Sequence, residues 1–333
     1  MSNLLLQLAG AVTLGLLAVD VFLTALTMRG AGPLTGRMAQ GLWRGLLRLH
    51  RARPSHRLLS FAGGAIAALT LAYWVMVLWA GWALVFAGAA GAVVDSQGQP
   101  ADLWSRIYFA GFNIFTLGLG DYRPVGAPWQ MATVLASASG LVVVTVGITY
   151  LLPVLSHAVS RQALAGQVGL LGLTPARVAM NAQAQGPDAF ADRLSGLEAD
   201  ILQQGRRHLA YPVLHYFHTG DPRLALPLRL AVLYEGLLIL THGLGEPDQP
   251  APPACLSTLA ALDLFLDSIA HDVLAGEAQT PPAPSLTPLA DAGAPVQSGA
   301  AFETALRHRD HRRGLMQGLL AHDGWRWSDV ADA

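Results

Sequence analysis

The sequence predicts an all-helical membrane protein, and composition, hydropathy and charge distribution each support that class. Of the 333 residues, 53% are hydrophobic and 13% are charged, and this charged share is about half that of a typical soluble domain. Three apolar stretches reach the length of about 20 helical residues that a bilayer requires. Residues 1–160 hold nine arginines and four acids, whereas residues 161–333 hold twelve arginines and eighteen acids. The membrane part therefore comes first, and a water-soluble part follows.

Composition also excludes several classes of function. The net charge of −1 leaves no basic excess that would favour nucleic acid as a partner. All 21 basic residues are arginine, which excludes lysine nucleophiles, Schiff bases and P-loop lysines. The single cysteine, Cys255, excludes an intrachain disulfide, and we expect it to be a small buried apolar side chain. We therefore expect no enzyme chemistry and no cofactor.

Residues 1–28 are the first expected element, an N-terminal transmembrane helix whose apolar run extends from Leu4 to Met28. No positively charged segment precedes the run and no convincing cleavage site follows it, so we interpret it as an uncleaved span. It contains one carboxylate, Asp20. Asp20 is either a proton or cation site or a carboxylate that faces neighbouring helices, and we favour the second interpretation.

Residues 29–57 are a short basic loop that orients the chain. The loop contains seven arginines: Arg29, Arg37, Arg44, Arg48, Arg51, Arg53 and Arg57. Short arginine-rich loops stay in the cytoplasm, which predicts a multi-pass protein of the inner membrane with its N-terminus outside and its C-terminal part cytoplasmic. Apolar residues mix with arginine in a roughly helical pattern, which fits an amphipathic helix on anionic headgroups. A voltage sensor would need arginine at every third position of an apolar span, and the spacing here is irregular.

Residues 58–157 contain two further apolar runs, Leu58–Val94 and Met131–Val154, separated by a segment of different character. Asp102 is a good N-cap for a helix over residues 103–115. About 13 residues give roughly 20 Å of helix, which enters but does not cross a bilayer core of about 30 Å. A short helix between two spans, followed by a glycine-rich loop, is typical of a re-entrant segment that is buried in protein or lines a water-filled path.

The remainder of the chain is expected to be a cytoplasmic helical domain over residues 158–275, with apolar residues at helical spacing. Residues 276–300 are rich in proline and alanine, and we expect a disordered linker there. Residues 301–333 are expected to form a C-terminal helix. The sequence does not identify a cytoplasmic partner or a regulatory ligand.

Histidines of the cytoplasmic part have two interpretations. His215 and His218 have the spacing that places side chains on one helix face. A metal site would need further ligands, and none is suggested nearby, so packing is the better interpretation. A pH-sensing role for these two histidines and His208 stays open.

The loop after the short helix carries the most informative pattern. It reads Thr116-Leu117-Gly118-Leu119-Gly120-Asp121. Two glycines at alternate positions allow a backbone in which successive carbonyls point the same way, because glycine enters conformations closed to other residues. Rings of such carbonyls from four chains, with the Thr116 hydroxyl as a further ring, replace the hydration shell of a potassium ion. The C-terminal end of the preceding helix carries partial negative charge, which also favours a cation.

TLGLGD resembles the potassium-channel signature TVGYGD, and TLGLGDYRP is similar to the second pore loop of two-pore-domain potassium channels. The unit over residues 58–157 resembles the pore domain of that superfamily and covers roughly a third of the chain. The resemblance implies an all-α membrane protein with a potassium-channel-like pore domain, one extra N-terminal transmembrane helix and a helical cytoplasmic domain. Within the pore domain, residues 103–115 are then the pore helix, 116–121 the filter and 129–157 the inner helix.

The resemblance also implies roles for individual residues. The ion-binding carbonyls belong to five consecutive residues: Thr116, Leu117, Gly118, Leu119 and Gly120. Asp121 belongs to the outer mouth. Gly140 lies where the inner helix commonly has a hinge glycine, with close helix packing as the alternative. Pro153 is placed to kink that helix, with ordinary termination as the alternative. Potassium at the filter is the only metal expected.

Two departures from the family pattern leave the ion selectivity open. Leu117 replaces the usual valine or isoleucine, and Leu119 replaces the usual aromatic residue, whose ring braces the filter. We predict a passive, potassium-selective channel, with a weakly selective cation channel and a non-conducting membrane sensor or scaffold as alternatives. One pore loop per chain supplies a quarter of a ring, so the expected partners are three further copies in a cyclic homotetramer, potassium ions and the lipid bilayer.

Overall fold

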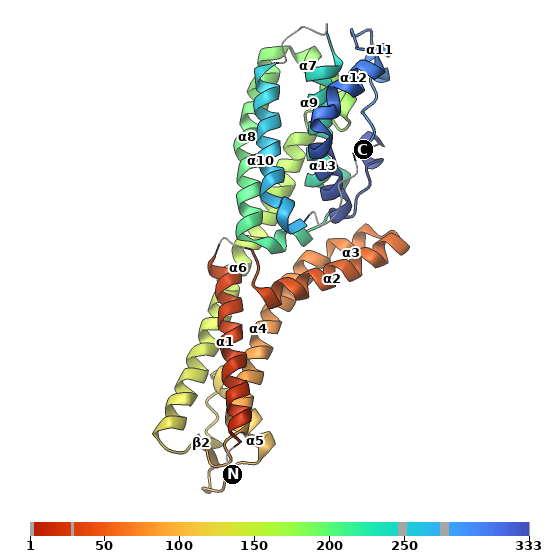
Figure 1. Cartoon of the computed structure of the whole chain (residues 1–333). Helices are drawn as coiled ribbons and strands as arrows, with labels where there is room; N and C mark the ends of the chain where they lie inside the picture. Colours follow the sequence, from red (N-terminus) through yellow and green to blue (C-terminus); the bar gives the residue numbers. More distant parts are fainter. Residues whose placement is uncertain (1–2, 28–29, 246–251, 274–279, 333) are drawn as a thin grey trace. The chain divides into compact units, whose positions relative to one another are not determined.

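A computed structural model describes residues 3–27, 30–245, 252–273 and 280–332 (Figure 1). Met28, Arg29 and residues 276–279 of the expected linker lie outside the described residues. The chain divides into two compact units. The first comprises Met1–Gly41 and Ala65–Val154, and the second comprises Leu42–Gly64 and Leu155–Ala333. The fold is that of an all-α membrane protein, as predicted.

The first unit holds the re-entrant segment between long helices (Figure 1). Its elements are α1 (Leu4–Leu26), the start of α2 (Pro33–Ala52), most of α4 (Ala62–Ala87), β1 (Val93–Asp95), α5 (Leu103–Ile114), β2 (Tyr122–Pro124) and the first part of α6 (Ala127–Gly169). β1 and β2 pair antiparallel, with Val94 opposite Arg123, and so join the two ends of the re-entrant segment.

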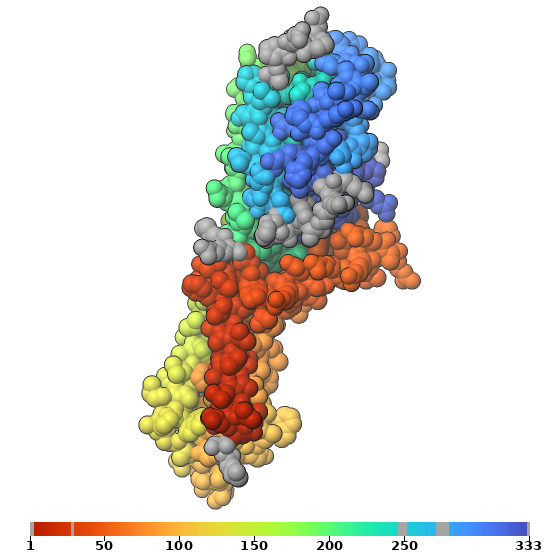
Figure 2. Space-filling model, in the orientation of Figure 1, coloured from red at the N-terminus to blue at the C-terminus, as the bar shows by residue number. Residues whose placement is uncertain are grey.

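A close contact between glycines packs α1 against α4. A Cβ atom on Gly10 would lie 2.6 Å from the carbonyl oxygen of Gly81, and one on Gly81 would lie 2.7 Å from the Leu14 side chain. Small residues at such contacts let helix backbones approach each other in membranes. Another side of α1 is uncovered (Figure 2), and Leu5 on it is 78% exposed. α1 therefore packs on α4 with one side and leaves another side uncovered within the chain.

Asp20 of α1 is fully buried and caps α2. Its carboxylate accepts hydrogen bonds from the backbone N–H groups of Leu34 at 2.8 Å and Thr35 at 3.2 Å, and from the Thr35 hydroxyl at 2.5 Å. The Thr35 hydroxyl in turn accepts from Trp74 Nε1 at 3.0 Å. These N–H groups belong to the first turn of α2 and have no partner within that helix. The geometry therefore agrees with a carboxylate that faces neighbouring helices.

Four described helical segments are long and apolar enough to cross a membrane, one more than the sequence predicts. They are Leu4–Leu26, His56–Ala87, Ala127–Gly169 and Pro253–Ala270. The fourth segment belongs to α10, and it packs in the core of the second unit, where Leu259 and Leu262 are fully buried. Length and composition alone cannot separate such a core helix from a membrane span.

The second unit is a bundle of helices joined by short helical turns (Figure 1). Its further elements are α3 (His56–Ser60), α7 (Pro175–Gln185), α8 (Pro187–Ala210), η1 (Pro212–Tyr216), η2 (Pro222–Leu224), α9 (Leu226–Leu238), η3 (Ile239–Gly243), α10 (Pro253–Val273), α11 (Thr287–Asp291), α12 (Gly299–Leu306), η4 (Arg307–Arg309), α13 (Asp310–Asp323) and α14 (Asp329–Asp332). α9 is buried along its whole length. The C-terminal residues 301–332 form several short elements instead of the single predicted helix.

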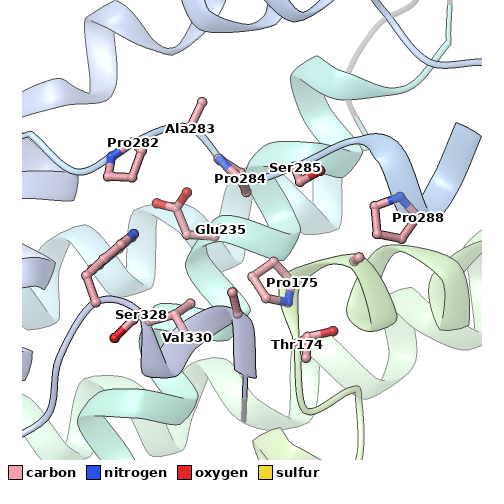
Figure 3. Close-up of a pocket in the computed structure, with 13 residues that line it drawn as sticks. Thr174, Pro175, Glu235, Pro282, Ala283, Pro284, Ser285, Pro288, Ser328 and Val330 are labelled. Atoms are coloured by element: carbon pink, nitrogen blue, oxygen red, sulfur yellow. The ribbon is translucent and has the colours of Figure 1, made fainter.

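The expectation of a disordered linker is wrong over its described part, residues 280–300. Arg313 donates to the carbonyls of Pro281 at 3.0 Å and Pro282 at 2.6 Å, and it pairs with the buried Glu235 at 2.8 Å. Leu289 is also fully buried. The proline-rich segment and Glu235 both line a pocket of about 360 Å³ (Figure 3). Composition predicts disorder here because proline and alanine side chains form no hydrogen bonds of their own. In the structure, residues of α9 and α13 supply the contacts that order the segment.

Two boundaries also differ from the sequence-based prediction. α6 continues past residue 157 to Gly169, and Pro153 lies inside it without ending it. The basic loop forms the predicted helix, α2, but part of its apolar face packs on protein. Trp43 is 1% exposed and donates from Nε1 to the carbonyl of His322 at 3.1 Å. This part of the apolar face is therefore unavailable to headgroups.

Candidate functional site

α5 is anchored to its neighbours along its length. Trp79 Nε1 of α4 donates to the Ile107 carbonyl at 3.0 Å. Arg106 donates to the Ala87 carbonyl at 2.7 Å and so satisfies the C-terminal end of α4. At the start of α5, the carboxylate of Asp102 accepts from the Ser105 N–H at 2.7 Å. That backbone hydrogen bond holds the pKa of the Asp102 carboxyl below its ordinary value.

The end of α5 and the start of the loop are one hydrogen-bonded structure. The Thr116 N–H donates to the Asn113 carbonyl at 3.0 Å, and the Leu117 N–H donates to the Phe112 carbonyl at 2.9 Å. This pair of bonds is the Schellman pattern, which requires a left-handed residue at the position that Thr116 occupies. Thr116 accordingly has φ of 54°. Glycine normally fills this position, and a β-branched residue there costs of order 1–3 kcal/mol.

Backbone handedness alternates through the loop. Thr116, Gly118 and Gly120 have φ of 54°, 61° and 78°, whereas the residues between them, Leu117 and Leu119, do not have positive φ. Alternation between left-handed and right-handed conformations turns successive carbonyls toward the same side of the chain. The sequence predicts this backbone from the two glycines, and the structure adds Thr116 as a third left-handed position.

The loop is uncovered within one chain. Every residue from Thr116 to Asp121 is exposed, with Leu117 at 59% and Leu119 at 53%. A Cβ atom on Gly118 or Gly120 would meet no atom within 4 Å. Irregular backbone is tolerated at membrane depth only where protein or a water-filled path covers it. The open side of the loop therefore needs a covering that one chain does not supply.

Gly140 lies against the end of α5, whereas Pro153 is not brought to the loop. A Cβ atom on Gly140 would lie 2.1 Å from the carbonyl oxygen of Ile114. Glycine is therefore required for the close approach of α6 to the last turn of α5. α6 continues as a helix through Gly140, so the geometry gives that residue a packing role, and its role as a hinge stays a prediction. Pro153 follows roughly three to four turns later on α6.

The outer end of the loop is held by aromatic residues that the sequence pattern did not single out. The Tyr122 hydroxyl and the Ser105 hydroxyl are 2.8 Å apart, which joins β2 to the first turn of α5. The ring of Tyr108 packs edge-on against Tyr122 and against Phe112, with centroids 6.2 Å and 5.3 Å apart. Tyr122 is part of the TLGLGDYRP string, so its position right after the loop was a usable signal.

The chemistry available at the loop is that of neutral oxygen ligands. Carbonyl oxygens suit hard cations, and Asp121 is the one ionisable side chain among residues 116–121. Among the described residues, no group of three or more histidines, cysteines or acids has a geometry that holds a metal ion.

Comparison with known proteins gives two matches. Residues 66–157 match a family model described as an ion channel. Over 325 residues, the chain is 30% identical to the uncharacterized membrane protein YdjJ of Bacillus subtilis (strain 168), and the match covers 96% of this chain and 94% of that protein. No solved structure matches. The range matched as an ion channel contains α5, the loop, β2 and the part of α6 that packs on α5.

Proposed function

Because the chain belongs to the family of the Bacillus subtilis membrane protein YdjJ and carries an ion-channel domain, we propose that it conducts potassium passively as a homotetramer. In this proposal the carbonyls of residues 116–120 and the Thr116 hydroxyl bind the ion, and Asp121 lies at the outer mouth. An ion channel of this kind needs no catalytic residue and no cofactor, because ions move down their electrochemical gradient.

The alternating backbone of the loop is the observation that carries the proposal. Left-handed conformations at Thr116, Gly118 and Gly120 direct successive carbonyls to one side, which is the arrangement that replaces a hydration shell. The strained conformation of Thr116 adds support. Glycine would be less costly at that position, and the threonine there supplies a hydroxyl oxygen that glycine lacks.

The uncovered loop supports assembly around an axis. One chain leaves residues 116–121 exposed, and a closed cyclic arrangement of four copies covers irregular backbone while it forms complete carbonyl rings. The exposed arginines of α2 support the orientation. No acidic residue lies between Asp20 and Asp95, so this basic segment belongs on the cytoplasmic side of the inner membrane, with the N-terminus outside and the second unit cytoplasmic.

A weakly selective cation channel is the second candidate. Leu119 stands where related loops have an aromatic ring, and its side chain is 53% exposed within one chain. Loss of that brace loosens the width of the filter. The backbone carbonyls are the same in both candidates, so only a comparison of permeant ions separates them.

The proposal is tested by ion flux from liposomes that contain the purified protein, with potassium and then sodium as the permeant ion and barium as the blocker. Barium-sensitive flux in potassium but not in sodium supports the selective channel. Equal flux in both ions favours the weakly selective channel. Absence of flux in both ions at every pH tested favours the non-conducting sensor or scaffold.

A matched pair of glycine substitutions tests the loop itself. Gly118 and Gly15 both have open space around the position of a Cβ atom, but only Gly118 has positive φ. Gly118→Ala should abolish flux, because alanine disfavours the left-handed conformation by roughly 1–2 kcal/mol. Gly15→Ala should leave flux unchanged. Normal conduction by Gly118→Ala would refute the assignment of the loop as the filter.

A further inference from the structure

Six histidines gather in the second unit around one buried ion pair. They are His50, His56, His208, His215, His218 and His322. The ion pair joins Arg161 Nη2 to Asp323 Oδ1 at 2.9 Å, with side chains that are 8% and 4% exposed. Arg161 belongs to α6, one turn beyond the range that matches an ion channel. The cluster therefore surrounds an extension of the helix that packs on the end of α5.

Two histidines extend the ion pair into a relay. His218 Nδ1 lies 3.3 Å from Asp323 Oδ2, and His218 Nε2 lies 3.0 Å from His56 Nδ1. A carboxylate only accepts, so His218 donates from Nδ1 and accepts at Nε2, and His56 donates from Nδ1. The hydrogen-bond partners thereby assign both tautomers. The contact between the two histidines needs a lone pair on one of the two facing nitrogens.

One dipeptide connects the relay to two helices of the channel domain. Arg161 Nη1 donates to the carbonyl of Phe217 at 2.5 Å, and the next residue is His218. The ring of Phe217 lies against Gly63 at the start of α4, where a Cβ atom would come within 2.6 Å of it. A displacement of His218 therefore moves the backbone that holds α6 and the ring that packs on α4.

We propose that His56, His218, Asp323 and Arg161 form a proton-operated latch that holds α6 at neutral pH and releases it in acid, so that protons regulate conduction. The regulatory part of this proposal rests on the proposed channel function, whereas the protonation of the relay does not. The ligand is the hydrated proton, taken up from the solvent that reaches His56, which is only partly buried.

The relay accepts one proton without breaking and fails at the second. The first proton binds His56 at Nε2, and His56 then passes its Nδ1 proton to His218 Nε2. The contact survives with donor and acceptor exchanged, because His56 is again neutral and accepts at Nδ1. A second proton on His56 places N–H groups on both sides of the 3.0 Å contact, and two imidazolium charges repel. Release is therefore a two-proton step.

The groups that face His56 set where it titrates. Burial, followed by His218 and by His50 from α2, lowers the pKa of His56, while Asp329 and Asp323 oppose that shift. His50 Nδ1 accepts a hydrogen bond from the Ser55 N–H at 3.1 Å. We therefore expect double protonation of the relay at a pH on the acidic side of the range in which histidine ordinarily titrates.

The carboxylate end of the relay stays charged throughout. Burial opposes ionisation of Asp323, but Arg161 and the hydrogen bond from His218 together hold the pKa of that carboxyl below its ordinary value. Protonation of the histidines therefore changes the charge balance around a fixed anion. Arg161 contacts Oδ1 of that carboxylate, and His218 contacts Oδ2.

The other three histidines of the cluster keep the surroundings neutral. Burial lowers the pKa of His208 and of His322 to about 4, and it lowers that of His215 well below the ordinary value. Arg161 adds to each of these shifts, and Arg44 and Arg51 also act on His322. With Arg161 and Asp323, these rings line a cavity of about 10 Å³, the size of one water molecule. They stay neutral where the relay titrates.

The test compares wild type with His56→Asn in the full chain. The asparagine amide keeps a neutral donor near the position of Nδ1 but takes up no proton. Flux is measured in liposomes buffered on both sides at about pH 7.5 and about pH 5.5, which brackets the histidine range. We expect wild-type flux to change about fivefold or more, with a proton dependence steeper than first order, and the change to disappear in His56→Asn. His308→Gln, an exposed histidine outside the cluster, should behave as wild type.

A second readout does not depend on conduction. Trp325 stacks on His56 with ring centroids 4.5 Å apart and packs against His218 with centroids 5.7 Å apart, so its fluorescence reports the protonation of the relay. The contribution of Trp325 is obtained by difference from Trp325→Phe. It should titrate steeply in wild type, and this steep titration should be lost in His56→Asn. A protein that never conducts but shows this titration would refute the channel and keep the relay. The latch is overturned if flux shows the same pH dependence in His56→Asn as in wild type, or if Trp325 fluorescence does not titrate.

Discussion

The loop over residues 116–121 and the buried network of Arg313 in the second unit meet opposite conditions. Residues 116–121 are exposed, have irregular backbone and leave space beside both glycines. Arg313 of the second unit is 2% exposed, and each of its donor nitrogens has an acceptor, either on Glu235 or on the carbonyls of Pro281 and Pro282. One region is thus incomplete within a single chain, and the other is complete.

The difference separates two kinds of polar group. Buried polar groups that are satisfied within the chain contribute to folding, and the loss of one partner leaves the other without compensation. Polar groups that a single chain leaves open are available to ions and to further copies. We therefore expect substitutions in the network of Arg313 to act on stability, and substitutions in the loop to act mainly on flux.

The largest expected effect comes from a substitution that breaks the buried network of Arg313. Arg313→Met should lower the free energy of unfolding by about 3–5 kcal/mol, because it leaves the Glu235 carboxylate buried without its partner. The measurement is chemical denaturation of the purified protein. Arg312→Met is the matched control, since its partner Asp267 is 53% exposed, and it should cost about 0–1 kcal/mol. Similar losses for both variants would show that burial does not set the cost.

The second effect is a dependence of stability on pH. The pKa values of His208 and His322 are lowered to about 4 in the fold by burial, so the unfolded chain binds these protons first as pH falls. Stability should therefore be greatest above about pH 6.5 and should decrease down to about pH 4, by up to about 1.4 kcal/mol per pH unit for each histidine. Melting temperatures across this range measure the effect. A melting temperature that rises on acidification would have the wrong sign.

The smallest expected effect on stability comes from a substitution in the loop. Thr116→Gly should stabilise the protein by about 1 kcal/mol, because glycine adopts the left-handed conformation without strain. The same variant should lose flux, because one ring of hydroxyl ligands is missing. Thr116→Ser keeps the hydroxyl and should keep most of the flux. Thermal unfolding and liposome flux on the three proteins provide the measurement, and a loss of stability in Thr116→Gly would argue against strain at this position.

The re-entrant segment was predictable because its signals are local. Asp102 marks the start of α5, and the predicted helix over residues 103–115 ends one residue later than the observed one. The alternating glycines are enough to indicate the backbone of the loop, because each of them permits a left-handed conformation by itself. Left-handed Thr116 was not predictable from residue preferences, because a β-branched residue disfavours that conformation and helix termination imposes it.

Features that depend on distant residues were not predictable. The proline-rich segment is ordered because Arg313 of α13 supplies its hydrogen bonds. The relay joins residues 56, 161, 218 and 323, and no spacing rule connects positions so far apart. Histidine spacing indicates a pH-sensing role only in general terms, because the neighbours in space decide which of these side chains titrate.

Because hydrogen bonds join the end of α5 to the loop, the length of α5 sets the direction in which the loop carbonyls point. Each residue added to an α-helix rotates its end by about 100°, so an insertion of one residue would aim the carbonyls of the loop away from any common axis. Only changes of three or four residues, close to a whole turn, restore the direction. Relatives of this protein should therefore vary freely in the turn that precedes Asp102 but differ in α5 length only by such steps.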